Sequence, residues 1–248
     1  MSTALRVVDT GLMPARVNIA LTSALAELHR AGQCPDTLRF HLYPPSVLIG
    51  RNQVLEEAVN LSYCRHNGIE IARRVTGGGA VFMGAGVLAW DIVAERRRFG
   101  FTLGLAAADI CGGFAAGLAR LGLPARYRPL NAIEIAGRKI SGAAGAFDGP
   151  TLAYQGTILV SVDMREMAGA LKHMAEPVTS LAAFFGRDPT MNEIKSVLTA
   201  GVADAWRRDI VHGALTPHET ALADRLFDER IGTDRFLSGD AEAELAAD

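Results

Sequence analysis

The sequence predicts an α+β fold with a mixed or antiparallel central sheet flanked by helices. Apolar stretches of strand length, several of which return across short turns, are concentrated before residue 164, and helical spacing of apolar residues dominates after it. A doubly wound parallel sheet would alternate strands and helices along the whole chain. The 248 residues, 49% of them hydrophobic, are enough for a sizeable core, and we expect one domain over residues 1–248.

The first third of the chain is expected to contain four strands and two helices. Pro14 sits where a helix can begin, Gly32 ends that helix, and Pro44-Pro45 separates two strands. The expected strands are ALRVVD (4–9), TLRFHLY (37–43), SVLIG (46–50) and IEIARRV (69–75), and the expected helices are ARVNIALTSALAELHRAG (15–32) and EAVNLSYCRHNG (57–68).

The middle of the chain is expected to be mainly strands, with one long helix of small residues. Strands lie in AVFMGAGVLAWDIVA (80–94, two strands around a turn at 84–86), ARYRP (125–129), AIEIAG (132–137) and TLAYQGTILVSVD (151–163). FTLGLAAADICGGFAAGLARLG (101–122) is the helix, and GRKISGAAGAFDG (137–149) is a linking segment. The later helices are MREMAGALKHM (164–174), MNEIKSVLTAGVADAW (191–206) and HETALADRLFDERI (218–231), followed by an alanine-rich acidic tail (238–248) expected to be frayed.

Composition excludes several function classes. The formal net charge of -2 lacks the basic excess that nucleic-acid binding requires. The three cysteines (Cys34, Cys64, Cys111) are widely spaced, which argues against a disulfide framework or zinc site and favours reduced, packed thiols. There is no HExxH pattern, no signal peptide and no apolar run long enough to span a membrane, so we expect a cytoplasmic protein without membrane or nucleic-acid partners.

The stretch ARRVTGGGAVF places two arginines directly before three consecutive glycines. It matches neither the Rossmann nor the P-loop fingerprint, but successive small residues can turn their backbone N–H groups towards one anion. Arg74 could reach the same anion with a bidentate fork. The alternative from local pattern alone is a glycine-rich hairpin with two surface arginines.

Three further stretches hold candidate site residues. Lys139, in GRKISGAAG, could supply a point charge for a phosphate or a developing oxyanion, or could be a solvated edge charge. Gly156, inside a strand, indicates that a ligand or another strand approaches the backbone closely. Arg51 and Gln53 leave the end of a buried strand. Asp91, Asp148 and Asp163 are expected at strand ends or turns, where capping is the common role.

Taken in order, VLIGRNQ, ARRVTGGGAVF, GRKISGAAG and YQGTILVSVD resemble the motifs of the lipoate–protein ligase A family, within the biotin and lipoate ligase and octanoyltransferase group. That family's pattern is roughly IGR-x-Q, RR-x-SGGGAV-(Y/F)-HD-x-GN, ND followed by KK-(I/V)-(S/A)-G, and HHGT-(I/L)-L. The resemblance extends from about Arg6 to Trp206 and includes EPVTSL. It implies a biotin/lipoate ligase-like catalytic domain.

The resemblance also implies an activity: ATP-dependent attachment of lipoate, or octanoate, to the lysine of a lipoyl carrier through a lipoyl-adenylate. The implied small molecules are ATP, Mg²⁺ and lipoic acid, and the implied partner is a GcvH-like carrier or an E2 lipoyl domain. Lys139 would stabilise charge at the mixed anhydride. Carried over by motif, the residues implied to bind substrate or adenylate are Arg51, Arg74, Thr76, Gly77, Gly78, Gly79, Ala80, Val81, Asn131, Ser141, Gly142, Gln155, Gly156 and Thr157.

The chain departs from the family pattern at three polar elements. Residues 83–87 (MGAGV) replace HD-x-GN, Asn131-Ala132 replaces ND, and Tyr154-Gln155 replaces the two histidines of HHGT. The polar or metal network near the ATP phosphates is therefore expected to differ, and no metal ligand is assigned. These departures leave room for an enzyme that performs only the transfer step, or for a non-catalytic lipoyl-binding homologue.

Two further comparisons bear on the alternatives. An octanoyltransferase would carry the acyl group on a cysteine shortly before the GRK lysine, whereas RYRPLNAIEIAGRK contains none. Larger ligases of the group add an accessory domain of roughly a hundred residues. Because the chain ends soon after ETALADRLFDERIGTDRF, we expect no appended accessory domain, or one supplied by a separate polypeptide.

Overall fold

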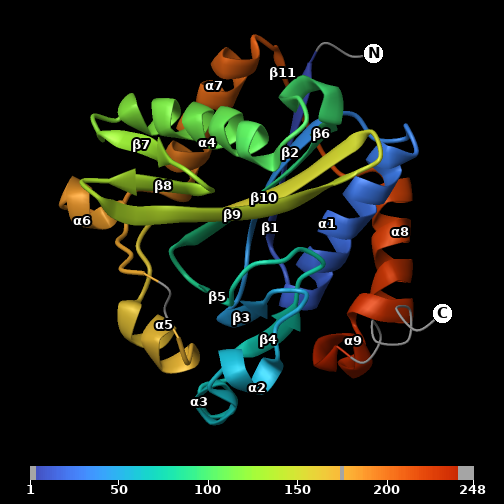
Figure 1. The fold of residues 1–248 in the computed structure, drawn as a ribbon, viewed down its shortest axis with the longest axis vertical. Coiled ribbons are helices and arrows are strands. Elements are labelled where there is room, and N and C mark those ends of the chain that lie inside the picture. Colours follow the sequence, from blue (N-terminus) through green and yellow to red (C-terminus); the bar gives the residue numbers. More distant parts are fainter. Residues whose placement is uncertain (1–3, 174–175, 240–248) are drawn as a thin grey trace.

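The computed structural model describes residues 4–173 and 176–239, in which two sheets are flanked by helices (Figure 1). The large sheet has the order β11-β1-β2-β6-β10-β9-β8-β7; its first three strands are parallel to one another, and the pairs from β2 onward are antiparallel. The small sheet has the order β4-β3-β5. The predicted α+β class with a mixed sheet is thus confirmed. The strands are β1 (Leu5–Leu12), β2 (Thr37–Leu42), β3 (Ser46–Ile49), β4 (Glu70–Arg73), β5 (Val81–Met83), β6 (Val87–Glu95), β7 (Ala125–Arg128), β8 (Ala132–Ile135), β9 (Arg138–Asp148), β10 (Thr151–Leu159) and β11 (Ile210–Gly213).

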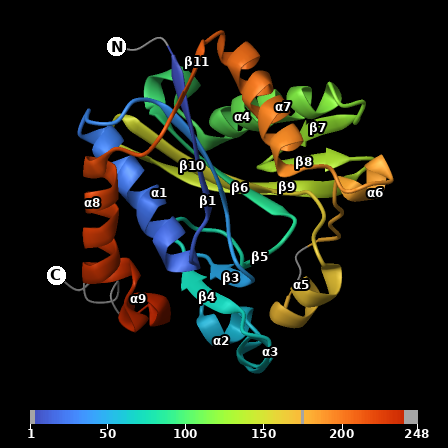
Figure 2. The ribbon, with the colours of Figure 1, turned by 180° about the vertical axis from the view of Figure 1, so that it is seen from behind.

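The large sheet separates two hydrophobic cores. Successive side chains of β6 point to opposite faces, so Ala89 and Val93 join one core while Trp90 and Ile92 join the other. The first core contains α1, α8 and the small sheet, and the second contains α4 and α7 (Figure 2). The helices are α1 (Ala15–Arg30), α2 (Leu55–Ala58), α3 (Leu61–His66), α4 (Leu103–Ala119), α5 (Met164–Ala170), α6 (Ala182–Phe185), α7 (Met191–Trp206), α8 (Pro217–Leu226) and α9 (Asp234–Ser238), with a 3-10 turn η1 (Arg96–Phe99) and a π-helical turn η2 (Phe227–Ile231).

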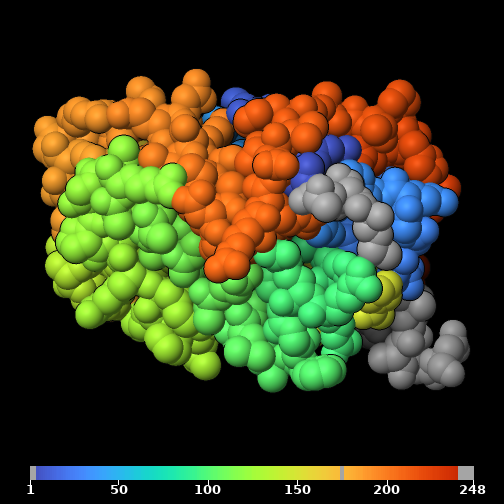
Figure 3. All heavy atoms as spheres, turned by 90° about the horizontal axis from the view of Figure 1, so that it is seen from above, coloured from blue at the N-terminus to red at the C-terminus, as the bar shows by residue number. Residues whose placement is uncertain are grey.

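Glycines allow α4 and α7 to pack at very short range. A Cβ on Gly117 would overlap the Val197 carbonyl, and one on Gly201 would overlap the Gly113 carbonyl. This contact explains why the predicted helix over 101–122 is so rich in small residues. Seen from above, the end of α7 and the chain that follows it (orange) lie against the green segment around η1, where Arg98 stacks 4.5 Å from the Trp206 ring (Figure 3).

The structure corrects several expected elements. The segment 137–149, expected as a link, is the eleven-residue strand β9, because β8 and β10 supply hydrogen-bonding partners on both sides of its small residues. The helix expected over 57–68 is broken into α2 and α3, where the Asn60 side chain accepts from the Tyr63 N–H at 3.2 Å and starts the second helix. The strands at 80–94 exist, but β5 and β6 belong to different sheets.

The C-terminal region is not entirely helical. Ile210–Gly213 adds β11 to the edge of the large sheet, parallel to β1, and α9 follows η2. Most of the tail expected to be frayed, residues 240–248, lies outside the described residues. None of the helices in the described ranges has the length and apolar character needed to cross a bilayer.

Candidate functional site

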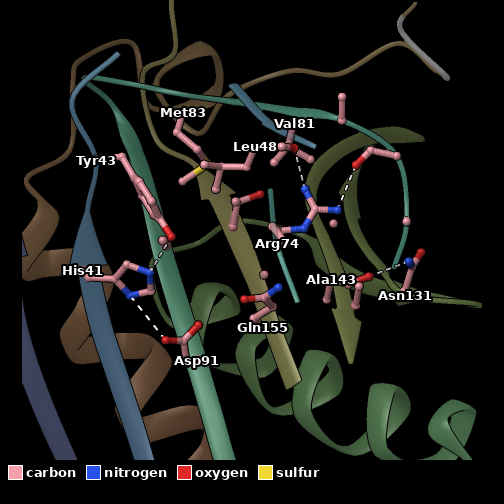
Figure 4. Close-up of a pocket in the computed structure, with 18 of the residues that line it drawn as sticks. His41, Tyr43, Leu48, Arg74, Val81, Met83, Asp91, Asn131, Ala143 and Gln155 are labelled. Atoms are coloured by element: carbon pink, nitrogen blue, oxygen red, sulfur yellow. Dashed lines mark hydrogen bonds and ion pairs between the residues drawn. The ribbon is translucent and has the colours of Figure 1, made fainter. Parts of the chain in front are cut away.

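A cavity of about 210 Å³ lies between the large sheet and the loop that joins β4 to β5 (Figure 4). Ala89 and Asp91 of β6 line it, which places it on the same face of the large sheet as α1. Of the residues predicted for the site, those that line the cavity are Arg74, Gly78, Gly79, Ala80, Val81, Asn131, Lys139, Gly142, Gln155, Gly156 and Thr157. The structure therefore brings together residues of ARRVTGGGAVF, GRKISGAAG and YQGTILVSVD, which are far apart in the sequence.

Arg74 holds the glycine loop in shape. Its guanidinium is buried and donates to the carbonyl oxygens of Leu48 (2.7 Å), Gly77 (3.0 Å) and Gly79 (2.9 Å), as Figure 4 shows in part. Burial lowers the pKa of Arg74 to about 10, so the group is still charged at neutral pH. Its positive charge thus lies at the cavity wall, and its contact with an anionic ligand stays a prediction.

The three consecutive glycines have different local environments. Gly78 has φ +96°, a conformation that residues with a Cβ rarely adopt. A Cβ on Gly50, at the end of β3, would overlap the Gly78 carbonyl oxygen, so the close packing of this loop also requires glycine at position 50. Around Gly77 and Gly79, by contrast, a Cβ would meet nothing within 4 Å. The open space at these two positions leaves room for a ligand to approach the backbone.

Lys139 lies on β9 and lines the cavity together with the glycine loop. Its side chain folds back over Gly142, and its Nζ lies 2.8 Å from the Glu176 carboxylate, which also pairs with Arg128. The hydrogen bond from Lys139 holds the pKa of Glu176 below its usual range. The Thr179 N–H donates to the Lys139 carbonyl at 2.8 Å and anchors this part of the EPVTSL segment beside β9. Glu176 was not among the predicted site residues.

Four predicted residues lie outside the cavity lining. Thr76 is buried, and its hydroxyl accepts a hydrogen bond from the Gln155 amide, which ties the glycine loop to β10. Arg51 is exposed, and its backbone N–H donates to the Thr76 carbonyl at 2.9 Å. Gly77 lies beside the lining residues of the loop. Ser141 is buried, with no hydrogen-bond partner for its hydroxyl among the described residues.

Two other predicted residues have roles within the fold. The Asn131 amide donates to the Ala143 carbonyl at 2.6 Å and fixes the chain before β8 against β9. Gly156 lines the cavity through its backbone, but the group that approaches it most closely is internal. A Cβ at this position would overlap the Trp90 ring on the other face of the sheet. The reading of Gly156 as a point of close approach is supported, with Trp90 as the neighbour.

The expectation that Asp91 caps a strand end is wrong. Asp91 lies in the middle of β6, fully enclosed, and its Oδ2 accepts from Arg39 Nη2 at 2.6 Å and from the Thr22 hydroxyl at 2.8 Å. A buried carboxylate is stable only when it is paired and hydrogen-bonded, as it is here. Asp163, in contrast, caps α5 as expected, accepting from the N–H groups of Arg165 and Glu166.

Sequence reasoning also missed eight residues that line the cavity, namely His41, Tyr43, Leu48, Met83, Ala89, Asp91, Ala143 and Ala144. A signal was present in two places. Arg39 and His41 interrupt the alternation of an otherwise buried strand, and Asp91 interrupts the apolar run VLAWDIVA. Charged or polar residues on both of two predicted strands indicate a buried polar pair, although not which residues face each other.

None of the three cysteines lines the cavity, and all three are buried, as expected. Burial raises the pKa of Cys34 and of Cys111 to about 12, the opposite of what a nucleophilic thiolate requires. Among the described residues, no group of three or more histidine, cysteine, aspartate or glutamate side chains is arranged to hold a metal ion. The cavity lining therefore includes the cations Arg74 and Lys139 and the carboxylate of Asp91, without a cysteine thiol.

A family model described as the lipoyl protein ligase A/B catalytic domain matches residues 14–203. Lipoate-protein ligase A subunit 1 of Thermoplasma acidophilum is 30% identical, over 90% of this chain and 92% of its own length. Octanoyltransferase LipM of Symbiobacterium thermophilum is 28% identical, over 95% of this chain and 98% of its own length. Sequence similarity thus extends to a ligase subunit and to a transferase.

Solved structures of lipoate protein ligases are also similar to this chain. The bi-partite lipoate protein ligase of T. acidophilum, described with its E2 lipoyl domain, has a TM-score of 0.86 at 29% identity, covering 96% of this chain and 97% of that chain. A lipoate-protein ligase A bound with ATP has a TM-score of 0.87 at 29% identity, covering 96% and 99%. A T. acidophilum protein with bound lipoic acid has a TM-score of 0.85 at 29% identity, covering 96% and 100%. Biotin protein ligase from Aquifex aeolicus shares the fold at 12% identity, with a TM-score of 0.50.

Proposed function

Because this chain belongs to the lipoyl protein ligase A/B catalytic domain family, we propose that it attaches lipoate to the lysine of a lipoyl carrier through a lipoyl-adenylate. The observation that carries the proposal is the composition of the cavity. Lys139 and the glycine loop face one space, with open backbone at Gly79 and no cysteine in its lining. A ligase needs cations and donors where phosphate charge develops, and it needs no enzyme nucleophile.

The proposed reaction has two steps. The lipoate carboxylate attacks the α-phosphorus of ATP, and pyrophosphate leaves; Lys139 and the charge on Arg74 stabilise the negative charge that develops on the phosphate oxygens. The carrier lysine amine then attacks the carbonyl carbon of the adenylate, and AMP leaves. Lys139 is the residue assigned to charge stabilisation in both steps. The Glu176 carboxylate, 2.8 Å from the Lys139 Nζ, competes with the substrate carboxylate for this ammonium.

The described residues contain no group of three or more histidine, cysteine, aspartate or glutamate side chains that could hold a metal ion. We propose that Mg²⁺ enters with ATP, held mainly by phosphates and water. No role is assigned to a protein metal ligand.

The proposed partner is an E2 lipoyl domain or a GcvH-like carrier. The T. acidophilum ligase with 29% identity is described as bi-partite and with its E2 lipoyl domain, which supports both a lipoyl-domain substrate and a separate accessory polypeptide. The second candidate function is octanoyl transfer, because an octanoyltransferase is 28% identical over most of the chain. The buried cysteines disfavour a thioester route, and a homologue that binds lipoyl groups without catalysis is the remaining alternative.

The test is a reconstituted lipoylation reaction. The protein is incubated with lipoic acid, ATP and Mg²⁺ and either a recombinant E2 lipoyl domain or a GcvH-like carrier, and AMP and carrier mass are measured. We expect AMP release and a carrier that gains one lipoyl group. A parallel reaction with the accessory subunit of a bi-partite relative tests whether a second polypeptide is needed. Lipoic acid binding with no AMP in either reaction would contradict the ligase proposal and favour a non-catalytic binder.

A further inference from the structure

The end of the cavity farthest from Lys139 is polar and enclosed. His41, Tyr43 and Asp91 line it with exposed fractions of 1%, 5% and 2%. Figure 4 shows the three side chains directed towards one another from β2, the residue after its end, and β6. The Tyr43 hydroxyl lies 3.3 Å from His41 Nε2, and His41 Nδ1 lies 3.9 Å from Asp91 Oδ2. A cavity end designed only for the methyl terminus of a fatty acyl chain would be expected to have apolar walls.

This polar end lies at the right distance from Lys139 for the tail of a medium-chain acid. The cavity crosses four neighbouring strands, from β9 through β10 and β6 to β2, with Thr157 paired to Ala89 and Ala89 paired to His41. Three strand spacings amount to about 14 Å. An extended eight-carbon acid with C–C bonds of about 1.5 Å is roughly 9 Å long. A carboxylate held at the Lys139 Nζ, which lies over Gly142 on β9, therefore places the far end of the chain about two strand spacings away, at β6 and beside β2.

The hydrogen-bonding groups at this end are not fully used within the protein. His41 Nδ1 faces the Asp91 carboxylate at 3.9 Å, and Nε2 faces Arg39 Nη2 at 3.4 Å, an arrangement that favours the tautomer with its proton on Nδ1. Nδ1 has no hydrogen-bond partner among the described residues, and burial keeps the pKa of His41 well below its usual range, so the ring is neutral. The 3.3 Å contact from Tyr43 is long for an O–H···N bond, so its hydroxyl can turn to a ligand group.

Asp91 is fixed by contacts within the protein through one of its two carboxylate oxygens. Its Oδ2 already accepts from Arg39 Nε at 2.9 Å, from Arg39 Nη2 at 2.6 Å and from the Thr22 hydroxyl. These contacts fix the orientation of the carboxylate, whereas the Tyr43 hydroxyl can rotate and His41 Nδ1 has no hydrogen-bond partner among the described residues. The buried thioether of Met83, which also lines the cavity, adds a polarisable neighbour suited to sulfur.

We propose that Tyr43 and His41 form a specificity site for the far end of the acyl chain, one that favours acids bearing a sulfur or hydroxyl group there over acids ending in a methyl group. The inference rests on the proposed function, because that function places the carboxylate at Lys139. Tyr43 is the residue assigned to discrimination. A methyl terminus displaces water from Tyr43 and His41 without replacing its hydrogen bonds, whereas a polar terminus replaces them.

The test measures acid binding to the whole protein by calorimetry in the absence of ATP. Three acids are compared at neutral pH: lipoic acid, octanoic acid and 8-hydroxyoctanoic acid. We expect 8-hydroxyoctanoic acid to bind at least as tightly as octanoic acid, because an apolar end would weaken the hydroxylated acid by about fivefold or more. Tyr43→Phe keeps the ring and is expected to weaken 8-hydroxyoctanoic acid by about three- to tenfold, the ratio given by one hydrogen bond of ordinary strength, while octanoic acid changes less than twofold.

Tyr63→Phe is the matched control, since Tyr63 lies on α3 outside the cavity lining and its change should leave all three affinities unaltered. A wild-type protein that binds octanoic acid fivefold more tightly than its hydroxylated analogue overturns the specificity site. Equal weakening of both acids by Tyr43→Phe overturns it as well. If Tyr43→Phe fails to fold, the wild-type comparison decides alone. Failure of the wild type to bind even lipoic acid would overturn the proposed function together with this inference, whereas binding of lipoic acid without discrimination would overturn the inference only.

Discussion

Lys139→Ala separates a catalytic from a structural role for the lysine at the cavity. The side chains of Lys139 and Glu176 are 22% and 31% exposed, and a salt bridge at such a position contributes at most about 1 kcal/mol to stability. The backbone contacts of Lys139 with β8 and Thr179 do not depend on its side chain. The free energy of unfolding should therefore fall by no more than about 1 kcal/mol. Loss of a group that stabilises developing charge costs about 2.7–4 kcal/mol in the transition state, or roughly 10²–10³ in rate.

The assay measures AMP release with saturating lipoic acid and ATP, alongside the midpoint of urea unfolding. Lys195→Ala is the matched control, because Lys195 also forms a salt bridge, 2.6 Å from Asp9, but lies outside the cavity lining. We expect both variants to lose little stability and only Lys139→Ala to lose activity. A rate for Lys139→Ala within threefold of wild type would refute the assignment of charge stabilisation to this lysine.

The remaining predictions concern the glycine loop and the partner of Lys139. Gly79→Val should abolish lipoic acid and ATP binding, because its side chain would fill the space where a ligand approaches the backbone. The Tm should change little, since a Cβ there meets nothing within 4 Å and Gly79 is not in the left-handed region. Gly112→Ala on α4 is the control, and unchanged affinity of Gly79→Val in calorimetry would mean that the loop is only a hairpin. Glu176→Gln should tighten lipoate binding by freeing the Lys139 ammonium, and weaker binding would contradict competition between the two carboxylates. The pKa of Glu176 is lowered in the folded state, so its pair with Lys139 stabilises the protein at neutral pH. This stabilisation is lost as pH falls through the lowered pKa. The Tm values of wild type and Glu176→Gln should therefore converge in acid.

Much of the site could be predicted from the sequence because its motifs have local causes. Glycine at positive φ, as at Gly78, and cations beside tight turns are visible in a short stretch of residues. Partners that come from distant segments were not visible. Glu176 pairs with a lysine 37 residues earlier, and Asp91 pairs with Arg39 across two strands, so their contacts depend on strand order and register.

In the fold, too, elements with a local sequence signal could be predicted, and elements that depend on distant segments could not. Helices with clear periodicity, such as α1 and α7, were predicted within a few residues of their bounds. The strand β9 was missed because its sequence, RKISGAAGAFD, is rich in glycine and alanine and contains only Ile140 and Phe147 of the β-branched and aromatic residues that mark a strand. Its neighbours β8 and β10 supply the stabilisation that its own residues do not. The strand β11 has only four residues and depends on the edge of β1 in the same way.

The most direct test of the central claim is the ATP dependence of acyl transfer in a protein without cysteines. Cys34, Cys64 and Cys111 are all replaced by Ala, and carrier modification is followed by intact mass spectrometry with two acyl sources: lipoic acid plus ATP, or octanoyl carrier protein without ATP. All three cysteines are buried outside the cavity lining, so we expect a modest loss of stability and largely intact lipoylation that requires ATP. We expect no acyl adduct on the wild-type protein from the octanoyl donor. An acyl-enzyme and ATP-independent carrier modification in the wild type, both lost in the cysteine-free variant, would contradict the ligase mechanism and identify a thioester transferase.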